Sequence, residues 1–108
     1  MTEIIVTDSS FEKEIVEKSN SVPVLVDFWA SWCMPCNMLG PVLGKIAENN
    51  EGKFVLAKVN VDENPGSSQK FSISSIPAVK LFKDGKVVGE FVGSMPEEAV
   101  TRWLEKNL

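Results

Sequence analysis

The chain has 108 residues, a length typical of one domain, and 44% of them are hydrophobic, as in an ordinary globular protein. Its 11 Lys and Arg residues against 15 Asp and Glu residues give a net charge of −4. A chain of this sign repels a phosphate backbone, so we do not expect nucleic acid as a partner.

Nothing in the sequence predicts a membrane segment or a secretory signal. No apolar stretch approaches the roughly 20 residues that a membrane helix needs. The run 1–6 lacks the basic flank and the apolar core of a signal peptide. We therefore expect a cytoplasmic protein without a membrane partner, although an exported protein that has already been processed would show the same features.

The chain begins with a short strand pattern followed by a helix pattern. Residues 3–6 are a short, mainly apolar run that predicts a strand. The run 9–12, Ser-Ser-Phe-Glu, then has the spacing of a capping box, in which a serine oxygen caps backbone N–H groups and the glutamate reaches back. We expect the first helix to continue to about Ser19.

The next apolar run predicts the centre of a sheet. Residues 22–30 are apolar except for Pro23 and Asp27, and such a run without alternation indicates a strand covered on both faces. From Met34 to about Asn50 apolar residues recur at helical spacing, which predicts a long helix.

The second half of the chain predicts further strands and a hairpin. Residues 54–61 form a strand pattern, and residues 64–71 form a short helix or turn. Residues 78–82 and 87–92 are two more strands, joined through Asp84-Gly85, which suits a two-residue turn with positive φ.

The chain ends in an amphipathic helix. The run 94–97, Ser-Met-Pro-Glu, has a second capping-box spacing. One apolar face follows, made up of Val100, Trp103, Leu104 and Leu108. The order of elements is βαβαβαββα, so we expect one α/β domain over residues 1–108.

The two cysteines, Cys33 and Cys36, are the residues best able to do chemistry, and they flank Met34 and Pro35 where a strand gives way to a helix. Thiolate is the reactive form, and a helix N-terminus stabilises it. We therefore expect Cys33 to attack a disulfide. Cys36, one turn further, would resolve the mixed disulfide and leave a redox-active Cys33–Cys36 disulfide.

Other uses of this cysteine pair have less support. A structural zinc site needs about four ligands, usually thiolates or imidazoles. The chain has no further cysteine and no histidine, so we expect no metal and no cofactor. The missing histidine also excludes a Cys–His nucleophile. Two idle buried cysteines remain as the alternative.

Asp27 is the second candidate for a role in the chemistry. The neighbouring residues of its strand leave no polar face, so its carboxyl group is expected to be buried, and burial raises a carboxyl pKa. It could then exchange a proton with Cys36. Lys58 could be its charged neighbour across the sheet. The alternatives are a hydrated or structural Asp27 at a sheet end and an ordinary lysine at a strand edge.

Together these residues resemble the thioredoxin family. The resemblance rests on the run 29–36 after an apolar strand, Asp27, Lys58, Ile76-Pro77 and the run 82–85, in the family's order and spacing over essentially the whole chain. It implies a thioredoxin fold, with a central mixed five-stranded sheet flanked by four helices. It also implies a monomeric cytosolic dithiol electron carrier that reduces protein disulfides and is recharged by a thioredoxin reductase.

The resemblance also assigns roles to single residues. It implies that Cys33 is the nucleophile, Cys36 the resolving thiol, Asp27 the buried acid/base and Lys58 its modulator. It makes Pro77 a cis proline that faces the disulfide. The substrate-binding surface that it implies consists of Trp32, Met34, Pro35, Ile76, Pro77 and Gly93.

Three positions depart from the family pattern: Met34 replaces a glycine, Asn37 a common lysine, and Ala78 the usual threonine. Loss of the lysine removes a positive charge from the first helical turn, and such a charge stabilises the Cys33 thiolate by roughly 0.3–1 kcal/mol. This free energy corresponds to a change of only tens of millivolts in the reduction potential. We therefore expect the reduction potential of the Cys33–Cys36 pair to lie in the reducing range. Met34 could enlarge the docking surface or obstruct a reductase. A fold of this kind used only as a binding subunit or holdase is the alternative function.

Overall fold

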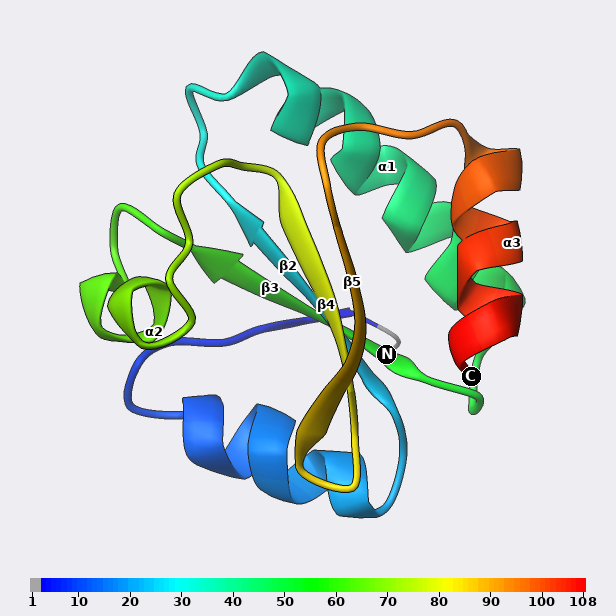
Figure 1. Cartoon of the computed structure of the whole chain (residues 1–108), viewed down its shortest axis with the longest axis horizontal. Helices are drawn as coiled ribbons and strands as arrows, with labels where there is room; N and C mark the ends of the chain where they lie inside the picture. Colours follow the sequence, from blue (N-terminus) through cyan, green and yellow to red (C-terminus); the bar gives the residue numbers. More distant parts are fainter. Residues whose placement is uncertain (1–2) are drawn as a thin grey trace.

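Strand β2, Val24–Trp29, is the middle strand of a five-stranded sheet in the computed structural model, which describes residues 3–108. The strand order is β1-β3-β2-β4-β5 (Figure 1). The other strands are β1, Glu3–Ile5; β3, Val55–Asn60; β4, Ala78–Lys83; and β5, Lys86–Val92. The prediction of a central strand is confirmed.

The sheet is mixed, as the resemblance to the thioredoxin family implied. β3 runs parallel to both β1 and β2, whereas β4 is antiparallel to its two neighbours, β2 and β5. A parallel pair needs a crossover connection, and α1, Met34–Asn49, provides it between β2 and β3. The N-terminus of α1 therefore lies at the carboxyl end of β2.

Helices cover both faces of this sheet (Figure 1). On one face lie α1 and α3, Glu97–Asn107, and on the other lie the first helical segment and α2, Pro65–Lys70. Alternate residues of β2 serve the two cores. Leu25 packs with the residues of α1 and α3, while Val24, Val26 and Phe28 pack on the opposite side. This two-sided burial explains the unbroken apolar run.

The first helix differs from the prediction. It consists of a wide π-helical segment η1, Glu12–Glu17, and a 3₁₀ turn η2, Lys18–Asn20. The expected capping box at 9–12 is wrong, because no side chain caps this helix and the Ser10 hydroxyl instead accepts the Thr7 N–H at 3.0 Å. The serine hydroxyls stabilise the preceding turn.

The second capping box is also wrong. Helix α3 begins at Glu97, directly after Pro96, and no side-chain hydrogen bond caps it. Glu97 is thus the first helical residue rather than the third, and its carboxylate lies 3.3 Å from the Lys45 ammonium on α1. The acidic side chain joins two helices instead of reaching back to its own N-terminus.

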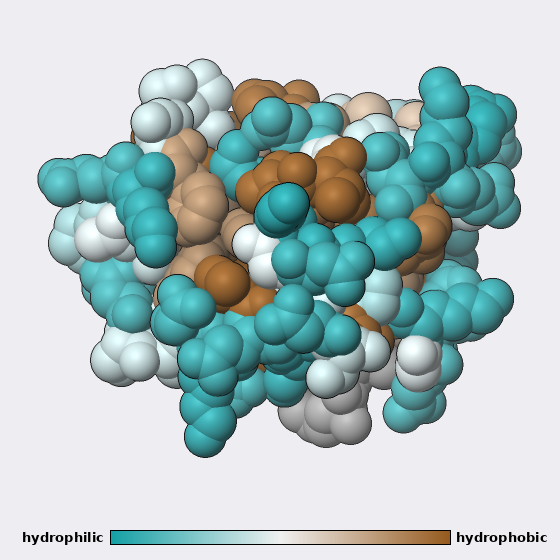
Figure 2. All heavy atoms as spheres, turned by 60° about the horizontal axis from the view of Figure 1, so that its bottom comes forward, coloured by the Kyte–Doolittle hydropathy of each residue, from teal (hydrophilic) through white to brown (hydrophobic). Residues whose placement is uncertain are grey.

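The hairpin between β4 and β5 matches its prediction. Asp84 and Gly85 have φ values of 53° and 79°, and Lys83 pairs with Lys86 across this two-residue turn. Buried Ser19 fixes the turn, since its carbonyl oxygen accepts the Asp84 N–H and its hydroxyl accepts the Gly85 N–H. The lower end of the molecule in Figure 1 comes forward in Figure 2, where hydrophilic residues surround smaller apolar patches.

Candidate functional site

A disulfide joins Cys33 and Cys36 where β2 passes into α1. The two Cα atoms lie 5.2 Å apart, and both cysteines are almost fully buried, with 4% and 3% of their surface exposed. The Cys33 N–H donates to the Ala30 carbonyl at 3.2 Å, which closes the turn before the helix. Ala30 and Trp29 pack around the sulfur atoms.

Cys33 occupies the N-cap of α1. Its Sγ atom accepts the backbone N–H of Cys36 at 3.2 Å. This N–H is one of the unpaired donors of a helix N-terminus, so it stabilises negative charge on the Cys33 sulfur after reduction. Pro35, in the first turn, supplies no donor. The same sulfur atom lies 3.8 Å from the carbonyl oxygen of Ile76.

Asp27 and Lys58 form an ion pair beneath the disulfide. They are register partners on β2 and β3, and the Lys58 Nζ donates to Asp27 Oδ2 at 2.7 Å. Asp27 is fully buried, and its Oδ1 has no hydrogen-bond partner within residues 3–108. Burial raises the pKa of Asp27, and the Lys58 charge opposes that rise only in part.

A cavity of about 450 Å³ lies between the Lys58 side of this ion pair and Cys36. Cys36 and Lys58 both line it, together with Trp29, over whose ring the Lys58 Nζ lies at 5.6 Å from the centroid. A cavity of this size, lined in part by polar side chains, has room for water. Cys36 and Lys58 are therefore accessible to water from the same cavity.

The residues expected to bind substrate lie around the disulfide. The Ile76–Pro77 peptide bond is cis, and the Gly93 N–H donates to the Pro77 carbonyl at 2.8 Å, so both segments are held together next to Cys33. Ile76 is half-buried. Trp32, Met34 and Pro35 are exposed in the turn and the first helical residues.

A model of the thioredoxin family matches residues 2–106 of this chain. Thioredoxin 1 of Nostoc sp. is 48% identical over 103 residues, which are 95% of this chain and 94% of that protein. The chain belongs to the thioredoxin family. Further relatives are the thioredoxin of Chlorobaculum thiosulfatiphilum, 45% identical over 94% of this chain and 93% of its own length, and that of Rickettsia felis, 43% identical over 95% and 96%.

Membership in the thioredoxin family establishes the reaction class. The protein is a protein-disulfide oxidoreductase, and the Cys33–Cys36 pair has the arrangement of a CxxC redox site. Protein disulfides are the general substrates of thioredoxins, and a thioredoxin reductase is their general partner. The predicted thioredoxin fold, α/β with a mixed five-stranded sheet, is confirmed.

Several residues of this thioredoxin site were not found from the sequence. The Trp32 Nε1–H donates to Asp62 Oδ2 at 2.8 Å, which fixes the exposed indole. Glu3 of β1 and two glycines of α1, Gly40 and Gly44, also line the cavity. Asp62 follows the carboxyl end of β3, which lies beside the carboxyl end of the parallel strand β2. This position in the sequence could have indicated that Asp62 belongs to the site. No sequence motif indicated the other three.

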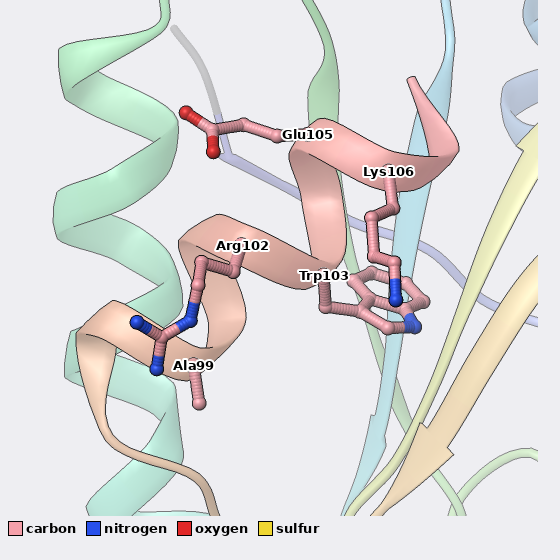
Figure 3. Close-up of a pocket in the computed structure, with 5 residues that line it drawn as sticks. All are labelled: Ala99, Arg102, Trp103, Glu105 and Lys106. Carbon is pink, nitrogen blue, oxygen red and sulfur yellow. The ribbon is translucent and has the colours of Figure 1, made fainter.

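Another hollow lies against α3 and lacks the features of a redox site. It measures about 550 Å³ and is lined by Ala99, Arg102, Trp103, Glu105 and Lys106. Figure 3 shows that its charged groups do not converge, since Arg102 and Glu105 extend from one side of α3 and Lys106 from the other. It contains no cysteine.

Residues 3–108 hold no group of three or more potential metal-ligating side chains. None of the helices in that range is both long and apolar enough to cross a membrane.

Proposed function

We propose that Cys33 is the attacking thiol of this thioredoxin and Cys36 the resolving thiol. The supporting observation is the 3.2 Å contact from the Cys36 N–H to the Cys33 sulfur at the N-cap of α1. A donor at that position stabilises the Cys33 thiolate, which is the nucleophilic form. Cys36 lies one turn inside the helix and lacks this stabilisation.

The reaction proceeds in two exchange steps. The Cys33 thiolate attacks one sulfur of a substrate disulfide, which forms a Cys33–substrate disulfide and releases the first substrate thiolate. Cys36 then loses its proton and attacks the Cys33 sulfur, which releases the second substrate thiolate and closes the Cys33–Cys36 disulfide. Two electrons pass to the substrate, and its thiolates take up protons.

Asp27 is the proton acceptor in the second step, and Lys58 modulates it. A general base works best when its pKa lies near the operating pH, and burial moves the Asp27 pKa upward in that direction. Cys36 and Lys58 share the cavity, and Lys58 holds Asp27 by the 2.7 Å ion pair. Water in the cavity carries the proton between these groups.

Substrates bind as extended segments on the surface around the disulfide. An extended peptide gains main-chain hydrogen bonds beside Ile76, in the manner of an added strand, and apolar contacts with Trp32 and Met34. Pro35 and Gly93 complete this surface, while Pro77 is buried and supports it from below through its carbonyl contact with Gly93. Met34 and Trp32 are 74% and 69% exposed, so both have apolar area left to bury.

We also propose the cellular setting. The protein acts as a monomeric single domain, residues 1–108, in the cytoplasm, where it carries electrons from a thioredoxin reductase to protein disulfides. Neither nucleic acid nor a membrane takes part. The negative net charge disfavours contact with a phosphate backbone.

A trapping experiment tests the two thiol roles. Cys36→Ser should accumulate a stable mixed disulfide with a substrate protein, detected by mass spectrometry at Cys33, whereas Cys33→Ser should accumulate none. Trapping through Cys36 in Cys33→Ser would reverse the assignment. The double Cys33→Ser, Cys36→Ser variant should lose all reductase activity, and retained biological activity would favour the binding-subunit alternative.

A further inference from the structure

Two glycines on α1 leave a slot for charged side chains above the edge of the sheet. Gly40 and Gly44 are one helical turn apart and both line the cavity beneath the disulfide. A Cβ atom at Gly40 would lie 3.3 Å from the Lys58 Nζ, and one at Gly44 would lie 3.4 Å from Glu3 Oε1. The helix backbone therefore lies close over an ammonium group and a carboxylate.

The register of the sheet brings Glu3 to the same side as the Asp27–Lys58 pair. Glu3 pairs with Leu56 in the parallel β1–β3 ladder, and Ile5 pairs with Lys58. Paired residues and residues two positions apart on one strand share a face, so Glu3 and Lys58 are diagonal neighbours. Long side chains at such positions can reach one another.

Few ionisable groups face this cavity. Glu3 comes from β1 and Lys58 from β3, and α1 contributes only the thiol of Cys36 when it is reduced. Asp27 of β2 does not line the cavity, but it is in contact with it through its ion pair with Lys58. Val79 of β4, the register partner of Asp27, is uncharged. The Lys58 ammonium is thus the one cation among the described groups lining the cavity, and two carboxylates lie on its side of the sheet.

We propose that Glu3 is a positioning residue for the proton transfer, because the slot left by Gly40 and Gly44 holds its carboxylate where it competes with Asp27 for the charge of Lys58. This inference rests on the proposed acid/base role of Asp27. A second negative charge near Lys58 makes ionisation of Asp27 less favourable. Burial is the main cause that raises the pKa of Asp27, and the Glu3 charge adds to that rise.

Glu3 also lies where the cavity meets solvent, since it is exposed while Asp27 is fully buried. Its carboxylate is therefore a charged group at the solvent side of the cavity that leads to Lys58. Exposure keeps its electrostatic effect moderate. We expect a tuning of the proton affinity of Asp27 rather than a switch.

The titration of the Asp27 carboxyl carbon, followed by NMR in the reduced protein, tests this inference. Glu3→Gln should lower the midpoint of Asp27 by about half a pH unit, and Glu3→Lys by about twice that, the size expected for a change of one and of two charges at a solvent-exposed position. Glu3→Asp keeps the charge and should restore most of the wild-type midpoint. The pH profile of mixed-disulfide resolution should shift by the same amount.

The control removes an equal charge on the other side of the sheet. Glu12→Gln, in η1, should leave the Asp27 midpoint unchanged. An unchanged Asp27 midpoint in both Glu3→Gln and Glu3→Lys would overturn the inference. If Asp27→Asn resolved mixed disulfides at the wild-type rate across pH, the acid/base role would fail, whereas the NMR midpoint would still decide whether Glu3 tunes Asp27.

Discussion

Asp27 combines two properties that rarely occur together in a side chain without a function. It is fully buried, and one of its carboxylate oxygens lacks a hydrogen-bond partner within residues 3–108. A buried polar atom without a partner costs about 1–3 kcal/mol. Its one cationic contact, Lys58, compensates for that cost only in part, which is consistent with a residue kept for chemistry rather than stability.

This cost predicts that Asp27→Asn stabilises the fold at neutral pH. Folding raises the pKa of Asp27, mainly by burial. The contribution of Asp27 to stability is therefore most favourable below its pKa in the unfolded chain, and it is lost as the pH rises through its pKa in the folded protein. Each unit of difference corresponds to about 1.4 kcal/mol. Urea unfolding should show Asp27→Asn above wild type at pH 8 and equal to it at pH 3; a gap independent of pH would contradict this explanation.

Met34 is the residue of the motif that departs most from the family pattern, and its exposed side chain predicts a role in substrate choice. Met34→Gly should lower kcat/KM about 3- to 10-fold for a peptide disulfide with apolar neighbours, equivalent to some 30–60 Å² of buried apolar area. A small synthetic disulfide should react as before, and Met34→Leu should retain the peptide rate. Equal loss with both substrates would point to altered thiol chemistry instead.

At the scale of elements, the loop before η1 anchors α2. The Asp8 carboxylate accepts the N–H groups of Gly66 and Ser67 at 2.9 and 2.8 Å and the Ser67 hydroxyl at 2.6 Å. It therefore caps, from 58 residues earlier in the chain, a short helix that has no local side-chain cap. Such a long-range contact is invisible in the sequence pattern.

Removal of this anchor should loosen α2 in a pH-dependent way. The hydrogen bonds from Ser67 lower the pKa of Asp8, so its contribution is present above the pKa of the unfolded chain and disappears as the pH falls through the folded value. Asp8→Ala should speed amide hydrogen exchange in α2 at pH 7, while Asp62→Ala, on another loop, should not. If wild type and Asp8→Ala differed as much at pH 2 as at pH 7, the carboxylate would not be the anchor.

Sequence patterns predicted the elements where local chemistry decides the structure. The apolar run became β2 because both of its faces are covered, and Asp84-Gly85 formed its turn because both residues adopt positive φ. The capping boxes failed because competing partners exist. Ser10 bonds to Thr7, and Glu97 lies beside Lys45 on another helix. Spacing alone does not contain such competition.

The candidate site likewise has some features that the sequence could predict and others that it could not. The cysteine pair and the burial of Asp27 were predictable, since the motif and the missing polar face lie within one short segment. The cavity was not, because it forms where β1, β3 and α1 meet. The places of Glu3, Gly40 and Gly44 in the cavity depend on the strand register and on how closely α1 approaches the sheet.

At the scale of the whole molecule, the topology assembles the site from separate segments. The parallel β2–β3 pair aligns Asp27 with Lys58, and the antiparallel strand β4 begins directly after Pro77, beside the start of α1. If either β3 or β4 ran in the opposite direction, these residues would lie at different ends of the sheet. The mixed sheet therefore places the carboxyl end of β2, the N-terminus of α1 and the start of β4 at one end of the molecule (Figure 1).

The reduction potential of the Cys33–Cys36 pair tests the central claim, that this protein is a thioredoxin-type reductant, most directly. The protein would be equilibrated in graded dithiothreitol buffers while tryptophan fluorescence is followed, because Trp29 packs against the disulfide. We predict a midpoint within some tens of millivolts of about −270 mV, the value typical of thioredoxin. A midpoint between about −180 and −120 mV, the range of disulfide isomerases and thiol oxidases, would contradict the claim.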